Sequence, residues 1–129
     1  MATSHRNCDV WAPCATGGAI NDITVHSIKH GAIVCGGANN QLATPILTDA
    51  LLKRNITYVP DYVANAGGVI ILAARRRDRL HLDYNTPEVL EQLEAIRGRV
   101  KEVLTRAREE DKPTAFIADR MAEERFNAS

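Results

Sequence analysis

Short apolar runs alternate with longer apolar stripes along the chain, and this pattern predicts a small α/β fold. Three short runs are rich in apolar side chains and are each followed by glycine, proline or other turn residues; they span residues 8–12, 32–35 and 56–59. Between and after these runs, apolar residues recur at helical spacing. Strands that alternate with helices are typical of a parallel sheet with crossover helices. We therefore expect about three parallel strands.

Two short helices are predicted between the strands. The first opens near Asn21, and Thr44 followed by Pro45 starts the second, because threonine caps free backbone N–H groups and proline suits the first helical position. The second helix is expected to end near Asn55. The side chains of the first helix that should face the sheet are Ile23, Val25 and Ile28.

Three longer helices are predicted after the third strand. Residues 62–74 are apolar and should form one helix, in which each glycine of Gly67-Gly68 costs about 1 kcal/mol relative to alanine. Thr86-Pro87 caps the next helix, which should end near Glu110. A final helix follows Pro113, and we assign these last helices packing roles. The side chains that the final helix is expected to bury are Phe116, Ile117 and Met121.

Small and amide-bearing residues cluster where the three strands end. The clusters read A-P-C-A at 12–15, G-G-A-N-N-Q at 36–41 and P-D-Y-V-A-N-A-G-G-V at 60–69. In open parallel sheets, ligands bind outside the carboxyl ends of the strands, and small residues let a ligand approach the backbone closely. The three clusters are therefore expected to line one crevice. Taken alone, adjacent asparagines are also typical of a turn, and paired glycines of a helix lying tightly on a sheet.

Composition excludes several classes of partner. The chain has 129 residues, 45% of them hydrophobic, with 16 basic against 16 acidic side chains, a balance that argues against binding nucleic acid or a membrane surface. The longest apolar stretch, residues 69–74, is far below the roughly 20 residues that span a membrane. Because no apolar segment follows Met1, we expect a cytoplasmic location. The basic run at residues 75–79 is more typical of a solvated face than of a phosphate site.

The cysteines indicate a reducing compartment and no metal site. Cys8, Cys14 and Cys35 are odd in number and lack C-x-x-C spacing. His5 with Cys8 and Cys14 is the one combination that suggests metal ligands, but free cysteine usually behaves as a small buried hydrophobe.

Four ordered segments carry a family resemblance. The segments read A-P-C-A at 12–15, A-N-N-Q-L at 38–42, P-D-Y-V with N-A-G-G-V within 60–69, and A-D-R-M-A-E-E-R at 118–125. Together they resemble the carboxy-terminal part of the NAD-dependent L-amino-acid dehydrogenases. That family acts on leucine, valine, phenylalanine and glutamate, and the two middle segments are closer to its branched-chain and aromatic members. The resemblance implies the second half of a Rossmann-like, doubly wound parallel sheet with carboxy-terminal packing helices.

The resemblance also implies a site. NAD is the expected cofactor, and an L-amino acid and its 2-oxo acid are the expected substrates. Amides suit such a site because they offer donors and acceptors without changing charge during hydride transfer. The implied cofactor-binding residues are Pro13, Cys14, Ala15, Asn39, Asn40 and Asn65. The implied residues of the substrate pocket are Asn40, Val69 and Leu72.

Parts that the family needs are not found in this sequence. No segment reads G-x-G-x-x-G, and none of the lysines lies in the glycine-rich context that the family uses for acid–base chemistry. We therefore assign no catalytic residue and expect residues 1–129 to be a partial NAD-binding domain, lacking the amino-terminal substrate domain and the glycine-rich loop. Alone, it should be inactive and bind NAD weakly or not at all.

Two partners and one alternative function follow from the incomplete sheet. The first strand is expected to pair with the missing amino-terminal half or with a second copy of the chain, because an uncovered strand edge invites pairing. The alternative is a non-catalytic α/β binding or interaction domain derived from the same fold.

Overall fold

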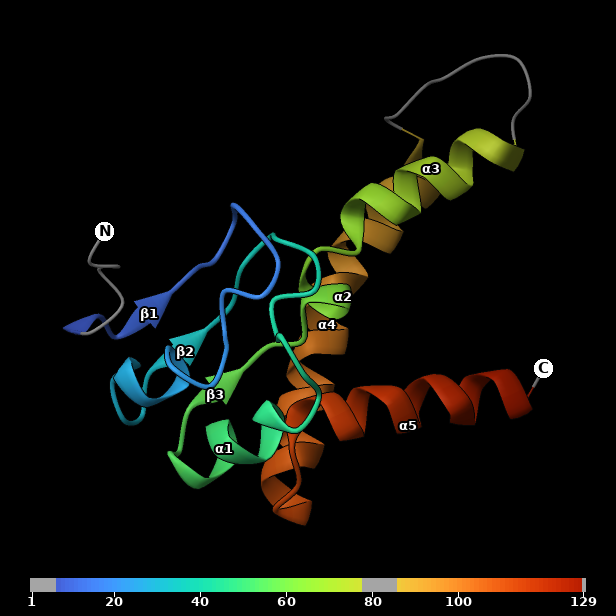
Figure 1. Ribbon diagram of the computed structural model, residues 1–129. Helices are drawn as coiled ribbons and strands as arrows, with labels where there is room; N and C mark the ends of the chain where they lie inside the picture. The colour runs from blue at the N-terminus through green and yellow to red at the C-terminus, as the bar shows by residue number, and fades with distance from the viewer. Residues whose placement is uncertain (1–6, 78–85, 129) are drawn as a thin grey trace.

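The computed structural model (Figure 1) describes residues 7–77 and 86–128 and has a small sheet beside an arm of helices. His5, Arg79 and the side chains of 75–77 lie outside the described part. The elements, in chain order, are β1 (Val10–Trp11), the 3₁₀ helix η2 (Val25–Ser27), β2 (Ile33–Val34), α1 (Leu47–Lys53), β3 (Thr57–Tyr58), α2 (Asp61–Ala64), α3 (Gly67–Arg77), α4 (Pro87–Glu110) and α5 (Thr114–Asn127).

The three strands form one parallel sheet in the order β1-β2-β3. The N–H of Ile33 donates to the carbonyl oxygen of Asp9 at 2.8 Å, and the N–H of Val59 donates to that of Val34 at 2.9 Å. Strands lie within all three predicted runs, although each is only two residues long. The α/β class and the parallel sheet are therefore confirmed.

The two faces of the sheet differ in burial. Trp11, Val34 and Tyr58 are register partners on one face, and they pack into a core with η2 and α1. On the opposite face, Val10 is 57% exposed and its partner Ile33 is 43% exposed. Parallel sheets are normally covered on both faces, so this apolar face of β1 and β2 is unusually open.

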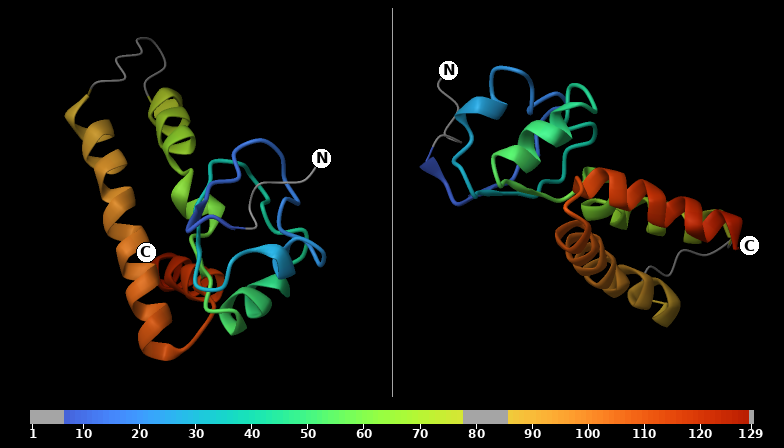
Figure 2. Two further views of the ribbon diagram at one scale, coloured as in Figure 1. Left: turned by 90° about the vertical axis from the view of Figure 1, so that its left-hand side faces the viewer. Right: turned by 90° about the horizontal axis from the view of Figure 1, so that it is seen from below.

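The helices after β3 form a second layer beside the sheet. Figure 2 shows α3 and α4 running side by side in opposite directions, with α5 packed near the carboxyl end of α4. A separate hydrophobic core joins α4 to α5, with Val63 of α2 packed against it; its buried members are Val103, Ala107, Ile117, Ala118 and Met121. The α2 helix thus connects the sheet layer to the helical layer.

Several helix boundaries match the sequence prediction. The side-chain oxygen of Thr86 accepts a hydrogen bond from the N–H of Val89, Pro87 is the first residue of α4, and α4 ends at Glu110. The predicted cap at Thr44 is wrong, because α1 begins at Leu47 and the carbonyl oxygen of Thr44, not its hydroxyl, accepts the N–H of Leu47. In the described chain, no helix is both long and apolar enough to cross a membrane.

Three other expectations are corrected. Ile23 is 84% exposed, because the Asn21 side chain accepts the N–H groups of Ile23 and Thr24 and forms a turn before η2. The predicted helix 62–74 is two helices, with a break at 65–66, and Gly67-Gly68 begins the second one. Phe116 is 52% exposed, whereas Ile117 and Met121 are buried as expected.

Candidate functional site

The loops after β1 and β2 lie in direct backbone contact. The N–H of Ala38 donates to the carbonyl oxygen of Pro13 at 3.0 Å. A Cβ atom on Gly36 would lie 2.1 Å from that same oxygen, so only glycine fits there without moving the Pro13 backbone. The N–H of Gly37 donates to Sγ of Cys14 at 3.3 Å. The segments with Pro13 and Cys14 therefore lie against the glycine-rich loop, as the crevice hypothesis requires.

Asn40 has a left-handed backbone that is fixed on both sides. Its φ angle is 51°, its N–H donates to Oδ2 of Asp61 at 2.8 Å, and its carbonyl oxygen accepts the N–H of Gly18 at 2.8 Å. Asparagine tolerates this conformation better than most residues do. Its side-chain amide is exposed and makes no hydrogen bond within the described structure. The backbone is therefore held while the amide stays open to a ligand.

Asn39 and Asn65 join the second and third strand-end loops. Nδ2 of Asn65 donates to Oδ1 of Asn39 at 2.6 Å and lies 3.3 Å from the carbonyl oxygen of Gly37. We call Asn39, Asn40 and Asn65 the amide cluster. These three predicted residues come from the loop after β2 and from the break between α2 and α3, close to the loop that carries Cys14.

The other predicted residues lie outside this hydrogen-bonded set. Ala15 is exposed in the loop after β1, next to Cys14. Val69 and Leu72 are on α3, where they are 69% and 60% exposed. Both are within two turns of Asn65, and their exposed apolar surface is available to a ligand or a partner chain.

Two residues that support the cluster were missed by the sequence analysis. Gln41 is fully buried, and its Nε2 donates to the carbonyl oxygens of Gly36 and Ala38 at 2.8 and 2.9 Å. Asp61 accepts both the N–H of Asn40 and, at 3.0 Å, the hydroxyl of Tyr58. Both residues stand within the strand-end clusters, but nothing in the local spacing distinguishes an exposed polar residue from a supporting one.

The tyrosines on either side of Asp61 are strongly perturbed. Burial raises the pKa of the Tyr58 hydroxyl well above its ordinary value, and the negative charge of Asp61 raises it further. Burial also raises the pKa of Tyr62, whose hydroxyl donates to Oδ1 of Asp119 at 2.6 Å. Both phenols therefore stay protonated donors across the physiological range.

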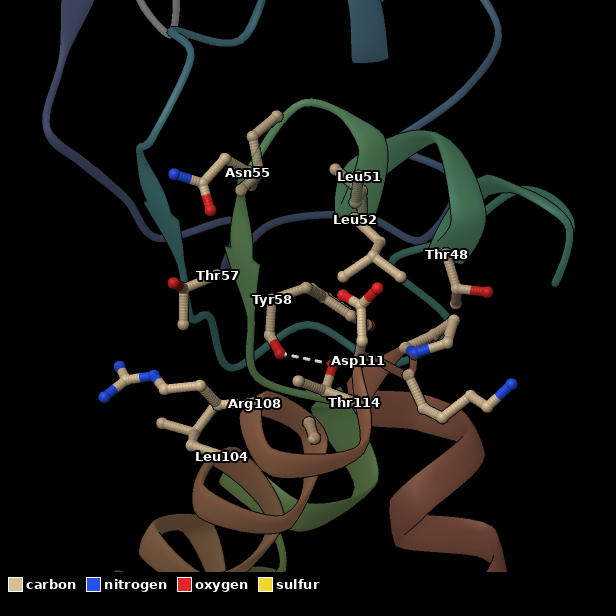
Figure 3. Close-up of a pocket in the computed structure, with 14 residues that line it drawn as sticks. Thr48, Leu51, Leu52, Asn55, Thr57, Tyr58, Leu104, Arg108, Asp111 and Thr114 are labelled. Carbon is tan, nitrogen blue, oxygen red and sulfur yellow. Dashed lines mark hydrogen bonds between the residues drawn. The ribbon is translucent and has the colours of Figure 1, made fainter.

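A hollow away from the amide cluster lies between α1, β3 and the corner that joins α4 to α5. It has a volume of about 220 Å³ and contains no residue of the amide cluster. Figure 3 shows Thr114 at its floor, where the hydroxyl donates to the carbonyl oxygen of Tyr58 at 2.6 Å. The hollow is smaller than the roughly 300–1,000 Å³ of typical ligand pockets. Its structural importance is that Thr114 ties α5 to the strand that leads into Asp61.

The described residues form neither a metal site nor a disulfide. Across 7–77 and 86–128, no group of three or more histidine, cysteine or acidic side chains could hold a metal ion. Among these residues, Cys8, Cys14 and Cys35 form no disulfide, and Cys14 is exposed.

Comparison with known proteins identifies the family. The family model described as Glutamate/Leucine/Phenylalanine/Valine dehydrogenase matches residues 2–127, nearly the whole chain. The chain belongs to this family.

The curated proteins that this dehydrogenase-family chain resembles in sequence include leucine and valine dehydrogenases. It is 43% identical to leucine dehydrogenase of Geobacillus stearothermophilus over 119 residues, covering 92% of the chain and 31% of the relative. It is 44% identical to valine dehydrogenase of Streptomyces coelicolor over 121 residues, covering 94% and 32%. The chain thus spans about a third of the length of these curated relatives.

A solved structure agrees with the fold of this family member. L-tryptophan dehydrogenase from Nostoc punctiforme superposes with a TM-score of 0.83 at 35% sequence identity, covering 93% of the chain and 35% of that protein. The Rossmann-like fold and the family resemblance seen in the sequence are therefore confirmed.

The amide cluster of this dehydrogenase-family chain offers a mixed set of hydrogen-bonding atoms. Within the described structure, three groups of the cluster have no hydrogen-bond partner in the protein. They are Nδ2 of Asn39, Oδ1 of Asn65 and the whole side-chain amide of Asn40. Together they supply donors and acceptors without a net charge. Such a set suits a neutral ligand that carries amide and hydroxyl groups.

Proposed function

We propose that the amide cluster faces the nicotinamide end of NAD, and that the chain forms the carboxy-terminal half of an NAD-binding domain. The complete protein would interconvert an L-amino acid and its 2-oxo acid, releasing or taking up ammonia. The observation that carries this proposal is the convergence of Asn39, Asn40 and Asn65 beside the loop of Pro13, Cys14 and Ala15. Family membership and the leucine and valine dehydrogenase relatives support it.

The residues present fit the nicotinamide end of the cofactor. A nicotinamide carboxamide has donors and an acceptor, and ribose hydroxyls have both, so they complement the unpaired atoms of the amide cluster. The bound cofactor supplies the chemistry of hydride transfer. The chain's own contribution is to orient the nicotinamide ring, with Asn39 and Asn65 held to each other and Asn40 free to reach the ligand.

For the substrate, we propose a pocket formed by Asn40, Val69 and Leu72. Val69 and Leu72 are large apolar side chains that are exposed on α3, which follows directly after the Asn65 break. Apolar surface at this position favours a branched-chain or aromatic amino acid. The amide of Asn40 would lie between the cofactor and the substrate.

The site is proposed to be completed by residues that this sequence does not contain. No catalytic residue is assigned here, and no segment reads G-x-G-x-x-G, so the acid–base groups and the phosphate contacts would come from the amino-terminal part of a complete enzyme. The open face of Val10 and Ile33 supports this proposal, because it offers apolar surface for such a part to cover. Alone, the chain should be inactive.

The first test measures whether the chain recognises the nicotinamide end of the cofactor. Reduced nicotinamide mononucleotide would be titrated into ¹⁵N-labelled chain while the side-chain NH₂ signals of the amide cluster are followed by NMR. We expect these signals to shift at millimolar ligand, and adenosine monophosphate to leave them unchanged. Asn39→Ala and Asn65→Ala should weaken the response, whereas the matched control Asn127→Ala, on exposed α5, should not.

The second test asks whether the chain completes an enzyme. It would be mixed with the leucine dehydrogenase of Geobacillus stearothermophilus truncated before the matched third, and NADH formation from leucine, valine and phenylalanine would be followed. Restored activity supports the dehydrogenase proposal. Formation of a complex without activity, together with no response to reduced nicotinamide mononucleotide, would instead favour the non-catalytic interaction domain.

Without a partner, the chain is proposed to self-associate. Among the described strands β1 is an outer strand, and its exposed Val10 extends the apolar face. Light scattering should give a mass above that of one chain at high concentration, and Val10→Lys should lower it. A single-chain mass at every concentration would contradict this proposal.

A further inference from the structure

One carboxylate connects the tyrosine at the end of β3 to the backbone of the amide cluster. Oδ1 of Asp61 accepts the hydroxyl of Tyr58 at 3.0 Å, and Oδ2 accepts the N–H of Asn40 at 2.8 Å. Asp61 is the first residue of α2, whereas Asn40 is 21 positions earlier, in the loop after β2. The contact therefore joins two strand-end loops at the position of the cluster.

The backbone of Asn40 needs such a contact. Its φ angle of 51° is in the left-handed region, which is disfavoured for residues other than glycine, although less so for asparagine. A hydrogen bond from a backbone N–H to a carboxylate is stronger than one to a neutral acceptor and offsets this cost. The N–H of Gly18 holds the Asn40 carbonyl from the other side. These two contacts fix the backbone of Asn40 and with it the direction of its Cα–Cβ bond.

Asp61 is itself held in place through Tyr58. The Tyr58 side chain is buried in the core of the sheet, being 3% exposed. Its carbonyl oxygen also accepts the hydroxyl of Thr114 at the start of α5. The rigid core of the sheet therefore fixes the tyrosine hydroxyl, and the hydroxyl fixes the carboxylate.

Each oxygen of Asp61 accepts one hydrogen bond from these protein donors. These two contacts fix the orientation of the carboxylate relative to Tyr58 and Asn40.

We infer that Asp61 is a positioning residue: supported by Tyr58, it holds the backbone of Asn40 so that the Asn40 amide faces the nicotinamide and the substrate. The inference rests on the proposed function for the ligand, but the effect on the Asn40 backbone is independent of that function. No ordinary spacing rule points to this residue, because its partner lies in a different loop.

The test compares three variants with the unaltered chain. Asp61→Ala removes both contacts of the carboxylate. Tyr58→Phe removes only the hydrogen bond that supports the carboxylate. Asp61→Asn keeps an oxygen that accepts the N–H of Asn40 and gains an NH₂ group that can donate to the oxygen of Tyr58. Asp119→Ala is the matched control, because Asp119 also accepts a tyrosine hydroxyl, that of Tyr62, but lies on α5 outside the cluster. It should lower stability without changing the cluster.

Two quantities are measured by NMR on each folded variant: hydrogen exchange of the Asn40 backbone N–H, and affinity for reduced nicotinamide mononucleotide. We expect Asp61→Ala to speed exchange about tenfold and weaken affinity about tenfold, as for the loss of one charge-assisted hydrogen bond. Tyr58→Phe should change both in the same direction by about threefold. Asp61→Asn should fall between the unaltered chain and Asp61→Ala, because it keeps a neutral acceptor for the N–H of Asn40, and Asp119→Ala should leave both quantities unchanged.

The outcomes separate the inference from the proposed function. Exchange at Asn40 that is unchanged in both Asp61→Ala and Tyr58→Phe would overturn the positioning role, whatever the chain binds. Equal effects of Asp119→Ala and Asp61→Ala would also overturn it, because the effect would then be general destabilisation. If Asp61→Ala releases Asn40 but the unaltered chain does not respond to the nucleotide, the positioning of the backbone is supported and the proposed function fails. If Asp61→Ala does not fold, Tyr58→Phe decides.

Discussion

The hydroxyl of Tyr62 on α2 donates a hydrogen bond to Oδ1 of Asp119 on α5 at 2.6 Å. The same hydroxyl lies 3.2 Å from the carbonyl oxygen of Ala115. Because α2 begins directly after β3, this contact joins the strand-end layer to the final helix. Together with the Thr114 contact to Tyr58, it ties α5 to β3 and α2.

Tyr62→Phe should lower the free energy of unfolding by about 1 kcal/mol, because it removes this hydrogen bond and leaves the ring. Urea unfolding checks the value. Asp119→Ala should cost a similar amount, and the double variant should cost little more than either one, because both changes remove the same bond. Fully additive losses would show that the two side chains act independently.

Stability should fall as the pH rises above about 10, the pKa of an ordinary tyrosine. Burial raises the pKa of both Tyr58 and Tyr62, so the folded chain keeps these protons at a pH where the unfolded chain loses them. Their contribution is fully present below about pH 10 and is lost as the pH rises toward the folded-state pKa. Tyr58→Phe should therefore flatten the alkaline loss, measured by urea unfolding at stepwise pH. An identical alkaline slope in the variant would contradict the expectation.

Gly36→Ala should destabilise the chain by about 1–3 kcal/mol, because the new Cβ would lie 2.1 Å from the carbonyl oxygen of Pro13 and the loops would have to separate. Gly98→Ala is the matched control, since Gly98 is in the middle of α4 with nothing within 4 Å of the added Cβ. That variant should gain about 0.5–1 kcal/mol from helix propensity. Thermal unfolding of the pair checks the opposite signs, and a stabilising Gly36→Ala would show that the loops are not in close contact.

Gln41→Leu should cost about 1–3 kcal/mol, because the buried carbonyl oxygens of Gly36 and Ala38 lose their shared donor. Gln41→Glu should cost more at neutral pH, since it places a buried negative charge against those oxygens. Gln92→Leu, on the exposed surface of α4, should change stability by less than about 0.5 kcal/mol. Denaturant unfolding of the three variants distinguishes a buried structural amide from a solvated one.

The pattern of apolar and turn residues predicted the strands and most helices, because the type of such an element depends mainly on residues close in the sequence. The three apolar runs and the Thr86-Pro87 cap needed only nearby residues to specify a strand or a helix start. The prediction of a continuous helix from 62 to 74 failed for the opposite reason. Asn65 leaves the helix where its side chain binds Asn39 and Gly37, 26 and 28 residues earlier, and no local preference contains those partners.

The meeting of the strand-end loops was predictable from the sequence, but the contacts between them were not. Small and amide-bearing residues after strands correctly indicated a meeting point of three loops, and Gly36 is small because the Pro13 backbone lies against it. The supporting roles of Asp61 and Gln41 were not predictable, because a carboxylate or an amide in a polar cluster is equally consistent with a solvated side chain. Their partners are set by how the loops fold over one another.

The alternation of sides along β1 has a spectroscopic consequence. Trp11 is the chain's only tryptophan, and it faces the covered side of the sheet while its neighbour Val10 faces the open side. A shift of β1 by one residue would exchange the two sides and place the indole in water. The fluorescence of a single side chain therefore reports the register of the outer strand, and does so without any added label.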